Sequence, residues 1–117
     1  MGNKVLLAVF LAAAGSWVWT NKRQQLFPLE PLYQKPYIVV YGKAACGYCN
    51  ALRKDLESRN VAYVWKSVEE QAVLQELGPR MKKAGFETSR FNLPVVDVNA
   101  EMMIRPESAV VIAKRGP

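Results

Sequence analysis

The sequence predicts an α/β fold, a four-stranded mixed sheet flanked by helices, with an N-terminal apolar helix in front of it. Residues 37–41 are of strand-forming type, and the apolar residues directly after them recur at the three- and four-residue spacing of a helix. A second strand-then-helix pattern covers residues 61–77. Two short apolar runs and a last helical pattern complete the order β-α-β-α-β-β-α. The first β-α-β unit implies parallel strands with a right-handed crossover, and the last two strands should be antiparallel.

The composition indicates one domain and no nucleic-acid partner. The chain has 117 residues, of which 50% are apolar, enough for one packed core. The net charge is +6, but the 16 Lys and Arg residues are spread along the chain without a long basic run. This pattern is typical of a solvated basic surface, or of one that attracts an anionic substrate or a membrane face.

Residues 1–21 are interpreted as a membrane anchor or signal segment. Val5–Trp19 contains 15 residues without a charge. In an uncleaved anchor, Trp17 and Trp19 would lie at the membrane interface, directly before Lys22-Arg23. We favour this interpretation, although the run is shorter than the ~20 residues of a usual span. Positive charges flank both ends, so the orientation in the membrane stays open.

Two other interpretations of the apolar segment stand beside the anchor. One is a signal peptide that is cleaved after the small residues 12–14, and the other is a buried helix of the folded domain. Residues 22–35 form a linker, in which Pro28 and Pro31 disfavour regular structure. The domain proper covers residues 36–117.

Local signals delimit the first elements of the domain. After the strand at 37–41, the first helix should end near Arg59, and a second strand should cover 61–65. The second helix is expected over residues 68–77, with Ser67 as its N-cap and a break at Gly78-Pro79, after which residues 80–84 resume as a short helical turn.

The C-terminal part of the domain is predicted in the same way. Residues 85–92 form a loop, and strands at 95–98 and 102–104 are joined by a connection of hairpin length. A closing helix should cover residues 106–114, with Pro106 in its first turn.

Both cysteines lie where the first strand gives way to the first helix. Cys46 falls at or just before the first helical turn, and Cys49 falls about one turn further. The free N–H groups and the dipole of a helix N-terminus stabilise a thiolate, so the pKa of Cys46 should lie below the usual value of about 8.5. We therefore interpret Cys46 as the attacking thiol and Cys49 as the resolving thiol of a thiol–disulfide oxidoreductase.

Two alternatives for the cysteine pair were weighed. A zinc site needs about four ligands, and the chain has no His and no third Cys, so a metal or iron–sulfur module would need Cys46 from two subunits. A purely structural disulfide is disfavoured, because a two-residue loop constrains the unfolded chain little. We predict no metal and no bound cofactor.

The order of elements, with C-x-x-C at the first strand–helix junction, resembles the thioredoxin superfamily and most closely the glutaredoxin family. The resemblance covers residues 36–115. Lys43 stands three residues before Cys46, Cys46-Gly-Tyr-Cys49 resembles the C-P-Y-C motif of the family, and Leu93-Pro94 resembles its T-V-P segment. The resemblance implies a thioredoxin-like fold and a cis peptide bond at Pro94.

The resemblance also implies roles for four further residues. Lys43 would stabilise the thiolate or meet a glutathione carboxylate, and Tyr48 would pack beside the bound thiol. The backbone of Leu93, before cis-Pro94, would pair with an extended substrate or with the cysteine of glutathione. Glutathione is then a possible co-substrate, and disulfide-bonded proteins are the other expected partners.

One segment departs from the family pattern. Glutaredoxins usually carry a Gly-Gly turn after the last strand and then an acidic residue, whereas Met103–Glu107 contains no glycine. Glu107 or Ser108 could substitute for the acidic residue. The departure keeps open a thioredoxin- or isomerase-like reductase that does not use glutathione. Our conclusion from the sequence is a glutaredoxin-like enzyme anchored to a membrane; the resemblance suggests the bacterial inner membrane, with the side open.

Overall fold

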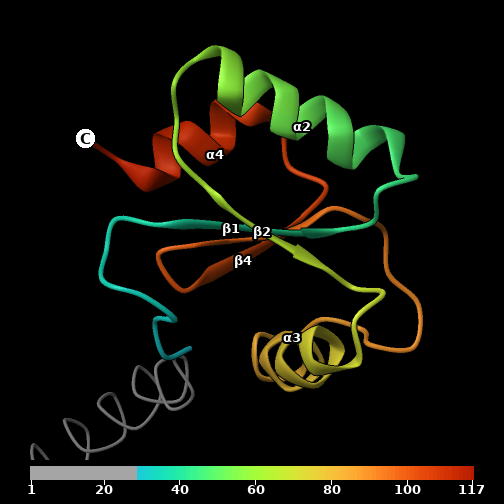
Figure 1. Cartoon of the computed structure of the whole chain (residues 1–117). Coiled ribbons are helices and arrows are strands. Elements are labelled where there is room, and N and C mark those ends of the chain that lie inside the picture. The colour runs from blue at the N-terminus through green and yellow to red at the C-terminus, as the bar shows by residue number, and fades with distance from the viewer. Residues whose placement is uncertain (1–28) are drawn as a thin grey trace, which may run out of the picture.

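The computed structural model describes residues 29–117, which form a four-stranded sheet with helices on both faces (Figure 1). The predicted order of strands and helices is confirmed. The apolar segment predicted within residues 1–21 lies outside the described residues. Within residues 29–117, no helix is long and apolar enough to cross a membrane. The elements are β1 (Ile38–Gly42), α2 (Gly47–Ser58), β2 (Val64–Ser67), α3 (Gln71–Lys83), β3 (Val95–Val98), β4 (Glu101–Ile104) and α4 (Ser108–Arg115).

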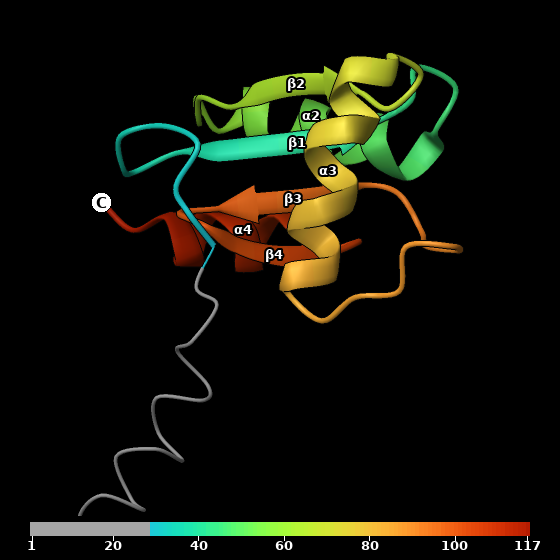
Figure 2. The same cartoon turned by 90° about the horizontal axis from the view of Figure 1, so that it is seen from below.

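The sheet has the strand order β2-β1-β3-β4. β1 and β2 are parallel and β3 and β4 are antiparallel, as the sequence predicts, and the structure adds an antiparallel pairing of β1 with β3. Helices α2 and α4 cover one face, and α3 runs across the strands on the other face (Figures 1 and 2). Side chains of β1 alternate between the two faces: Val39 and Tyr41 join the core beneath α3, and Ile38 and Val40 join the core beneath α2 and α4.

Helix α3 differs from its prediction at both ends. It begins at Gln71 with Glu70 as N-cap, because the Ser67 hydroxyl instead accepts the Glu69 N–H within the preceding turn, at 3.2 Å. It then continues through Gly78-Pro79 to Lys83. Its buried residues Val73, Leu77 and Met81 recur every four residues on both sides of Pro79. Burial of this continuous stripe therefore outweighs the backbone hydrogen bond that Pro79 cannot donate.

Two other boundaries are shifted from the predicted ones. β2 covers Val64–Ser67 instead of 61–65, because Val61 N–H donates to the Leu56 carbonyl at 2.9 Å and closes the end of α2. α4 covers Ser108–Arg115 instead of 106–114, with Glu107 as its extended N-cap residue. Pro106 consequently stands before the helix and not within its first turn.

Residues 29–36 contain no helix or strand, but they pack against the domain. Leu29 and Leu32 contact the core on the α3 face of the sheet. The Leu32 N–H donates to the Tyr37 hydroxyl at 3.2 Å, and Arg80 of α3 donates to the Glu30 carbonyl at 2.6 Å. This part of the segment predicted as a linker is therefore bound to the domain surface.

Candidate active site

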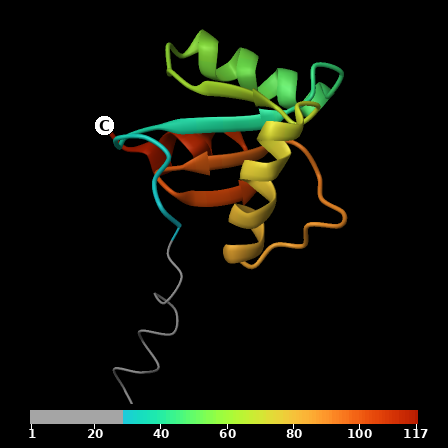
Figure 3. The ribbon, with the colours of Figure 1, turned by 60° about the horizontal axis from the view of Figure 1, so that its bottom comes forward.

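One end of the sheet brings together the segments that carry the predicted site. The turn before α2 and the segment from α3 to β3 both extend from this end (Figure 3). The Cys46 N–H donates to the Lys43 carbonyl at 3.1 Å, which closes the turn between β1 and α2. The register pairs Tyr41 of β1 with Val95 of β3, directly after Pro94. The cysteine pair and the proline segment thus follow from neighbouring strand ends.

Cys46 is the N-cap residue of α2. Its Sγ accepts a hydrogen bond from the Cys49 N–H at 3.1 Å, and the two cysteines form a disulfide with their Cα atoms 5.2 Å apart. Cys49 is fully buried, whereas Cys46 is half-buried. Of the two sulfur-bearing residues, Cys46 is therefore the one that a substrate can approach.

Gly42 at the end of β1 allows Cys49 to lie this close to the sheet. A Cβ atom at residue 42 would lie 2.6 Å from the Cys49 Sγ and 2.8 Å from the ring of Trp65. Side chains of ordinary residues do not fit at such distances. The absence of a side chain at Gly42 is consequently a requirement of the cysteine pair.

The Leu93–Pro94 peptide bond is cis, as the resemblance implies. Pro94 is buried and Leu93 is half-buried. The Pro94 carbonyl accepts the backbone N–H of Arg105 at 2.7 Å, and the Leu93 carbonyl accepts the Arg105 Nε–H at 2.9 Å. The backbone acceptor that the sequence assigns to a substrate is thus in contact with an arginine of this chain.

Arg105 is the site residue that the sequence reasoning missed. Its guanidinium carbon lies 4.0 Å from the centroid of the Tyr48 ring, and Tyr48 itself is 62% exposed. The backbone of Arg105 is left-handed, with φ of 50°. The sequence signal for Arg105 was the absence of the family's Gly-Gly turn from Met103–Glu107. A left-handed backbone position usually carries a glycine, and here it carries Arg105.

A groove of about 850 Å³ lies between α2 and α4. Of the predicted site residues, Tyr48 and Pro94 line it, whereas Lys43, Leu93 and the two cysteines do not. The other lining residues come from α2, from the link between β4 and α4, and from the first residue of α4: Ala51, Leu52, Lys54, Asp55, Ser58, Arg105, Pro106, Glu107 and Ser108. Lys43 is exposed, and its side chain has no hydrogen-bond or ion-pair partner among residues 29–117.

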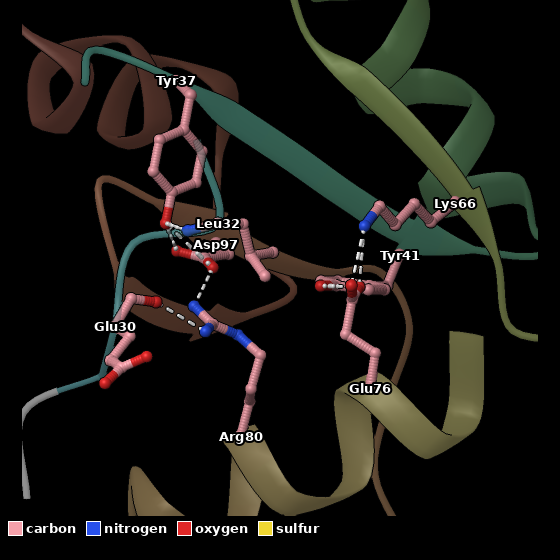
Figure 4. Close-up of polar contacts among 8 residues, drawn as sticks. All are labelled: Glu30, Leu32, Tyr37, Tyr41, Lys66, Glu76, Arg80 and Asp97. Carbon is pink, nitrogen blue, oxygen red and sulfur yellow. Dashed lines mark hydrogen bonds and ion pairs between the residues drawn. The ribbon is translucent and has the colours of Figure 1, made fainter. Parts of the chain in front are cut away.

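A polar cluster lies on the α3 face of the sheet (Figure 4). Lys66 contacts both carboxylate oxygens of Glu76, at 2.9 and 2.8 Å, and the Tyr41 hydroxyl donates to Glu76 at 2.7 Å. Burial alone would raise the pKa of Glu76, but these hydrogen bonds outweigh it and the pKa is lowered. Burial alone would likewise lower the pKa of Lys66, but the contact with Glu76 outweighs it and raises the pKa.

Asp97 of β3 is the centre of a second polar cluster on the same face (Figure 4). Its carboxylate is fully buried, accepts a hydrogen bond from the Tyr37 hydroxyl at 3.1 Å, and forms an ion pair with Arg80. These contacts join α3, β3 and the residue directly before β1 on the face of the sheet opposite to α2. Across residues 29–117, no group of three or more His, Cys, Asp or Glu side chains lies in a metal-binding arrangement.

Comparisons with known proteins agree with this geometry. The glutaredoxin family model matches residues 38–103. A search of curated proteins found no match. Among solved structures, glutaredoxin 1 from Francisella tularensis, complexed with cacodylate, is 17% identical with a TM-score of 0.46, over 58% of this chain and 80% of that chain. A glutaredoxin from Archaeoglobus fulgidus is 15% identical with a TM-score of 0.51, over 70% of this chain and 90% of that chain.

The second likeness shows a shared thioredoxin-like fold, with the four-stranded mixed sheet described above. The family match spans more than half of the chain and includes both cysteines and the Leu93-Pro94 segment. It ends before Arg105, at residue 103. On the strength of this match, the chain belongs to the glutaredoxin family.

Proposed function

We propose that this glutaredoxin-family thiol–disulfide oxidoreductase uses Cys46 as its nucleophile and Cys49 as its resolving thiol. The difference in exposure between the two residues carries the assignment: Cys46 is half-buried at the helix N-cap, and Cys49 is fully buried behind it. In the reduced protein, the Cys49 N–H and the dipole of α2 favour the thiolate of Cys46. The buried Cys49 can react only with the Sγ of Cys46, after that sulfur has been joined to the substrate in a mixed disulfide.

The reaction proceeds in two exchanges of one S–S bond for another. The Cys46 thiolate attacks one sulfur of the substrate disulfide, and the other sulfur leaves as a thiolate that takes up a proton. Cys49 then loses its proton and attacks Cys46 Sγ, which releases the second substrate thiol. The protein ends with the Cys46–Cys49 disulfide, having given two electrons to the substrate. A thiol such as glutathione restores the dithiol by the reverse exchanges.

Glutathione mixed disulfides and protein disulfides are the proposed substrates. Tyr48 and Pro94 line the groove beside the cysteines, and Glu107 and Ser108 at the start of α4 line the same groove. This arrangement favours a substrate whose thiol lies beside Tyr48 and whose polar end lies near Glu107 and Ser108. Lys43 is exposed beside the turn and could turn toward a carboxylate.

We also propose that residues 1–21 hold the domain at a membrane, the bacterial inner membrane by family resemblance, with residues 22–35 as linker. The uncharged run Val5–Trp19 before Lys22-Arg23 supports this proposal.

The test of the catalytic roles uses the full-length chain in mild detergent. We expect reduction of a glutathione mixed disulfide by the wild type, no turnover by Cys46→Ser, and partial turnover by Cys49→Ser, because a nucleophile alone can exchange with glutathione. Full activity of Cys46→Ser would contradict the assignment.

A reductase that does not depend on glutathione is the second candidate. It is favoured by Arg105, which stands in the glycine-free segment and contacts the Leu93 carbonyl. A wild type that reduces a protein disulfide but not the glutathione mixed disulfide, with the same dependence on Cys46, would select this candidate.

A further inference from the structure

Arg105 connects three segments that surround the cysteine pair. Its backbone N–H donates to Pro94, its Nε–H donates to the Leu93 carbonyl at 2.9 Å, and its guanidinium stacks on Tyr48. The residue therefore joins the link between β4 and α4 to the cis-proline segment and to the first turn of α2. It also lines the groove between the two helices.

The backbone conformation of Arg105 indicates that these contacts hold it in place. Within residues 29–117, the other non-glycine residues with positive φ are Asn60, Asn99 and Ala100. Asn60 follows the end of α2, and Asn99 and Ala100 form the turn between β3 and β4. An arginine in the left-handed region is disfavoured by the clash of its Cβ with the backbone. The contacts with Leu93, Pro94 and Tyr48 offset this cost.

The guanidinium has binding capacity that these contacts leave unused. Among residues 29–117, no side chain or carbonyl accepts a hydrogen bond from its two Nη groups, and no carboxylate forms an ion pair with it. Of the two carboxylates that line the groove, Asp55 accepts from Ser108 and lies 3.7 Å from Arg59, and Glu107 forms no ion pair within this range. The planar fork of an arginine is well suited to a carboxylate.

The Nε–H of Arg105 occupies the acceptor that an extended substrate needs. A substrate strand that pairs with Leu93 donates its own N–H to the same carbonyl and competes with the arginine for it. An uncharged substrate forms one hydrogen bond to the Leu93 carbonyl and breaks the one that Arg105 makes to it. A substrate with a carboxylate beside its reacting cysteine gains in addition an ion pair with the displaced guanidinium.

We propose that Arg105 is a specificity-determining residue, which selects disulfides that carry a carboxylate next to the reacting cysteine. It does so by exchanging its bond to the Leu93 carbonyl for an ion pair with that carboxylate. The proposal rests on the proposed function, because the selection is exerted on the disulfide that Cys46 attacks. The carboxylate belongs either to an acidic segment of a protein substrate or to glutathione.

Two blocked peptides that differ only in charge test the selection. Acetyl-Glu-Cys-Glu-amide and acetyl-Gln-Cys-Gln-amide are each prepared as a mixed disulfide with 2-mercaptoethanol, which is uncharged. The reduced full-length protein is mixed with each peptide, and the released peptide thiol is quantified at quenched time points over one turnover. We expect the wild type to react at least about fivefold faster with the acidic peptide at low salt.

The substitution Arg105→Gln should reduce this preference to within about twofold, because the ion pair is removed. Arg105→Gly should do the same, and it fits the left-handed backbone, so the result does not depend on one variant that fails to fold. Arg105→Lys should keep part of the preference. The preference of the wild type should also fall between about 20 mM and about 500 mM salt, because screening weakens an exposed ion pair.

Arg53 supplies a matched control. Its guanidinium carbon also lies 4.0 Å from an aromatic ring, that of Trp65, and its Nε–H also donates to an oxygen, the Tyr63 hydroxyl at 3.1 Å. It does not line the groove. Arg53→Gln removes the same charge and should leave the preference for the acidic peptide unchanged.

A glutathione–mercaptoethanol mixed disulfide distinguishes the two sources of the carboxylate. If Arg105→Gln slows this substrate as much as the acidic peptide, glutathione itself is recognised; if it slows only the peptide, an acidic protein segment is. Equal rates of the wild type with the two peptides, or an unchanged preference in Arg105→Gln, would overturn the role of Arg105 alone. A wild type that reduces none of the three disulfides would overturn the proposed function and this proposal with it.

Discussion

Gly42 leaves room for the Cys46–Cys49 pair because its side chain is only a hydrogen atom. The residue ends β1, is buried, and has the Cys49 Sγ and the Trp65 ring within 3 Å of where a Cβ would stand. The sheet and α2 approach each other closely at this point. The nearest atoms belong to the disulfide-bonded Cys49 and to the Trp65 ring, and neither residue can easily move aside in a close-packed core.

The substitution Gly42→Ala should therefore lower the free energy of unfolding by about 1–3 kcal/mol, as overpacking of a core does. It should also slow disulfide exchange, because the added methyl group displaces Cys49. Urea denaturation of the oxidised full-length protein measures the first effect, and the single-turnover assay measures the second.

Gly47→Ala is the matched control for this prediction. Nothing lies within 4 Å of a Cβ at this exposed first residue of α2. The control should leave the stability unchanged or raise it by up to about 1 kcal/mol, the difference in helix propensity. Equal effects of the two substitutions would contradict the role given to Gly42.

At the scale of an element, α3 is a helix with a proline in its interior. Pro79 lies in its interior, is exposed, and cannot donate to the Gln75 carbonyl one turn earlier. The residue before a proline is disfavoured in helical conformation unless it lacks a Cβ, and Gly78 lacks one. Gly78 and Pro79, where the sequence predicted a break in the helix, are therefore compatible with a continuous helix when they occur together.

The substitution Pro79→Ala should raise the free energy of unfolding by about 1–3 kcal/mol, because it restores the missing hydrogen bond. Gly78→Ala alone should gain nothing, because the new Cβ meets the proline ring, whereas in the Pro79→Ala background it should add about 1 kcal/mol. Urea denaturation of the four proteins forms a double-mutant cycle. Additive effects would show that the pair is not coupled.

At the scale of the whole molecule, polar clusters join the layers on the α3 face. Glu76 of α3 holds Lys66 of β2 and Tyr41 of β1, and Arg80 of α3 holds Asp97 of β3 and the Glu30 carbonyl (Figure 4). The helix is thereby bound to three strands and to the segment that leads away from the domain. The pKa shifts of the first cluster make its contribution depend on pH.

The lowered pKa of Glu76 means that its contribution to stability is present above the unfolded-state pKa of about 4.3 and is lost as the pH falls through the folded-state pKa. At pH 7, Glu76→Gln should therefore lower the free energy of unfolding by about 1–2 kcal/mol. The difference from the wild type should shrink as the pH falls through the lowered folded-state pKa of Glu76, because the wild-type carboxyl then becomes neutral as well.

Glu101→Gln provides the comparison, because Glu101 pairs with Lys114 at the surface, where the two side chains are 61% and 46% exposed. Its effect should stay within about 0.5 kcal/mol at all pH values. Urea denaturation between pH 3 and pH 7 measures both variants. A difference for Glu76→Gln that grows toward low pH would contradict the sign of the shift.

The sequence by itself determined the order of the elements, the parallel pairing of the first two strands, the antiparallel pairing of the last two, and the position of Cys46 at the start of a helix. These features depend on periodicity, on helix and strand signals and on connection lengths, all of which act between residues close in the chain. The cis bond at Pro94 was implied by a family motif of the same local kind. The pairing of β1 with β3, which brings the cysteines beside the proline segment, was seen only in the structure.

Only the tertiary structure decided which distant side chains meet. The sequence indicates that Asp97 lies within an apolar strand, but it does not identify Arg80 and Tyr37 as its partners. It also predicts a break in the second helix at Pro79, whereas in the structure the buried face of α3 continues past this proline. It also gave no role to Arg105, which reaches Tyr48 and Leu93 across the site. Such contacts depend on how helices pack on the sheet, and the energy of that packing outweighs the local preferences of single residues.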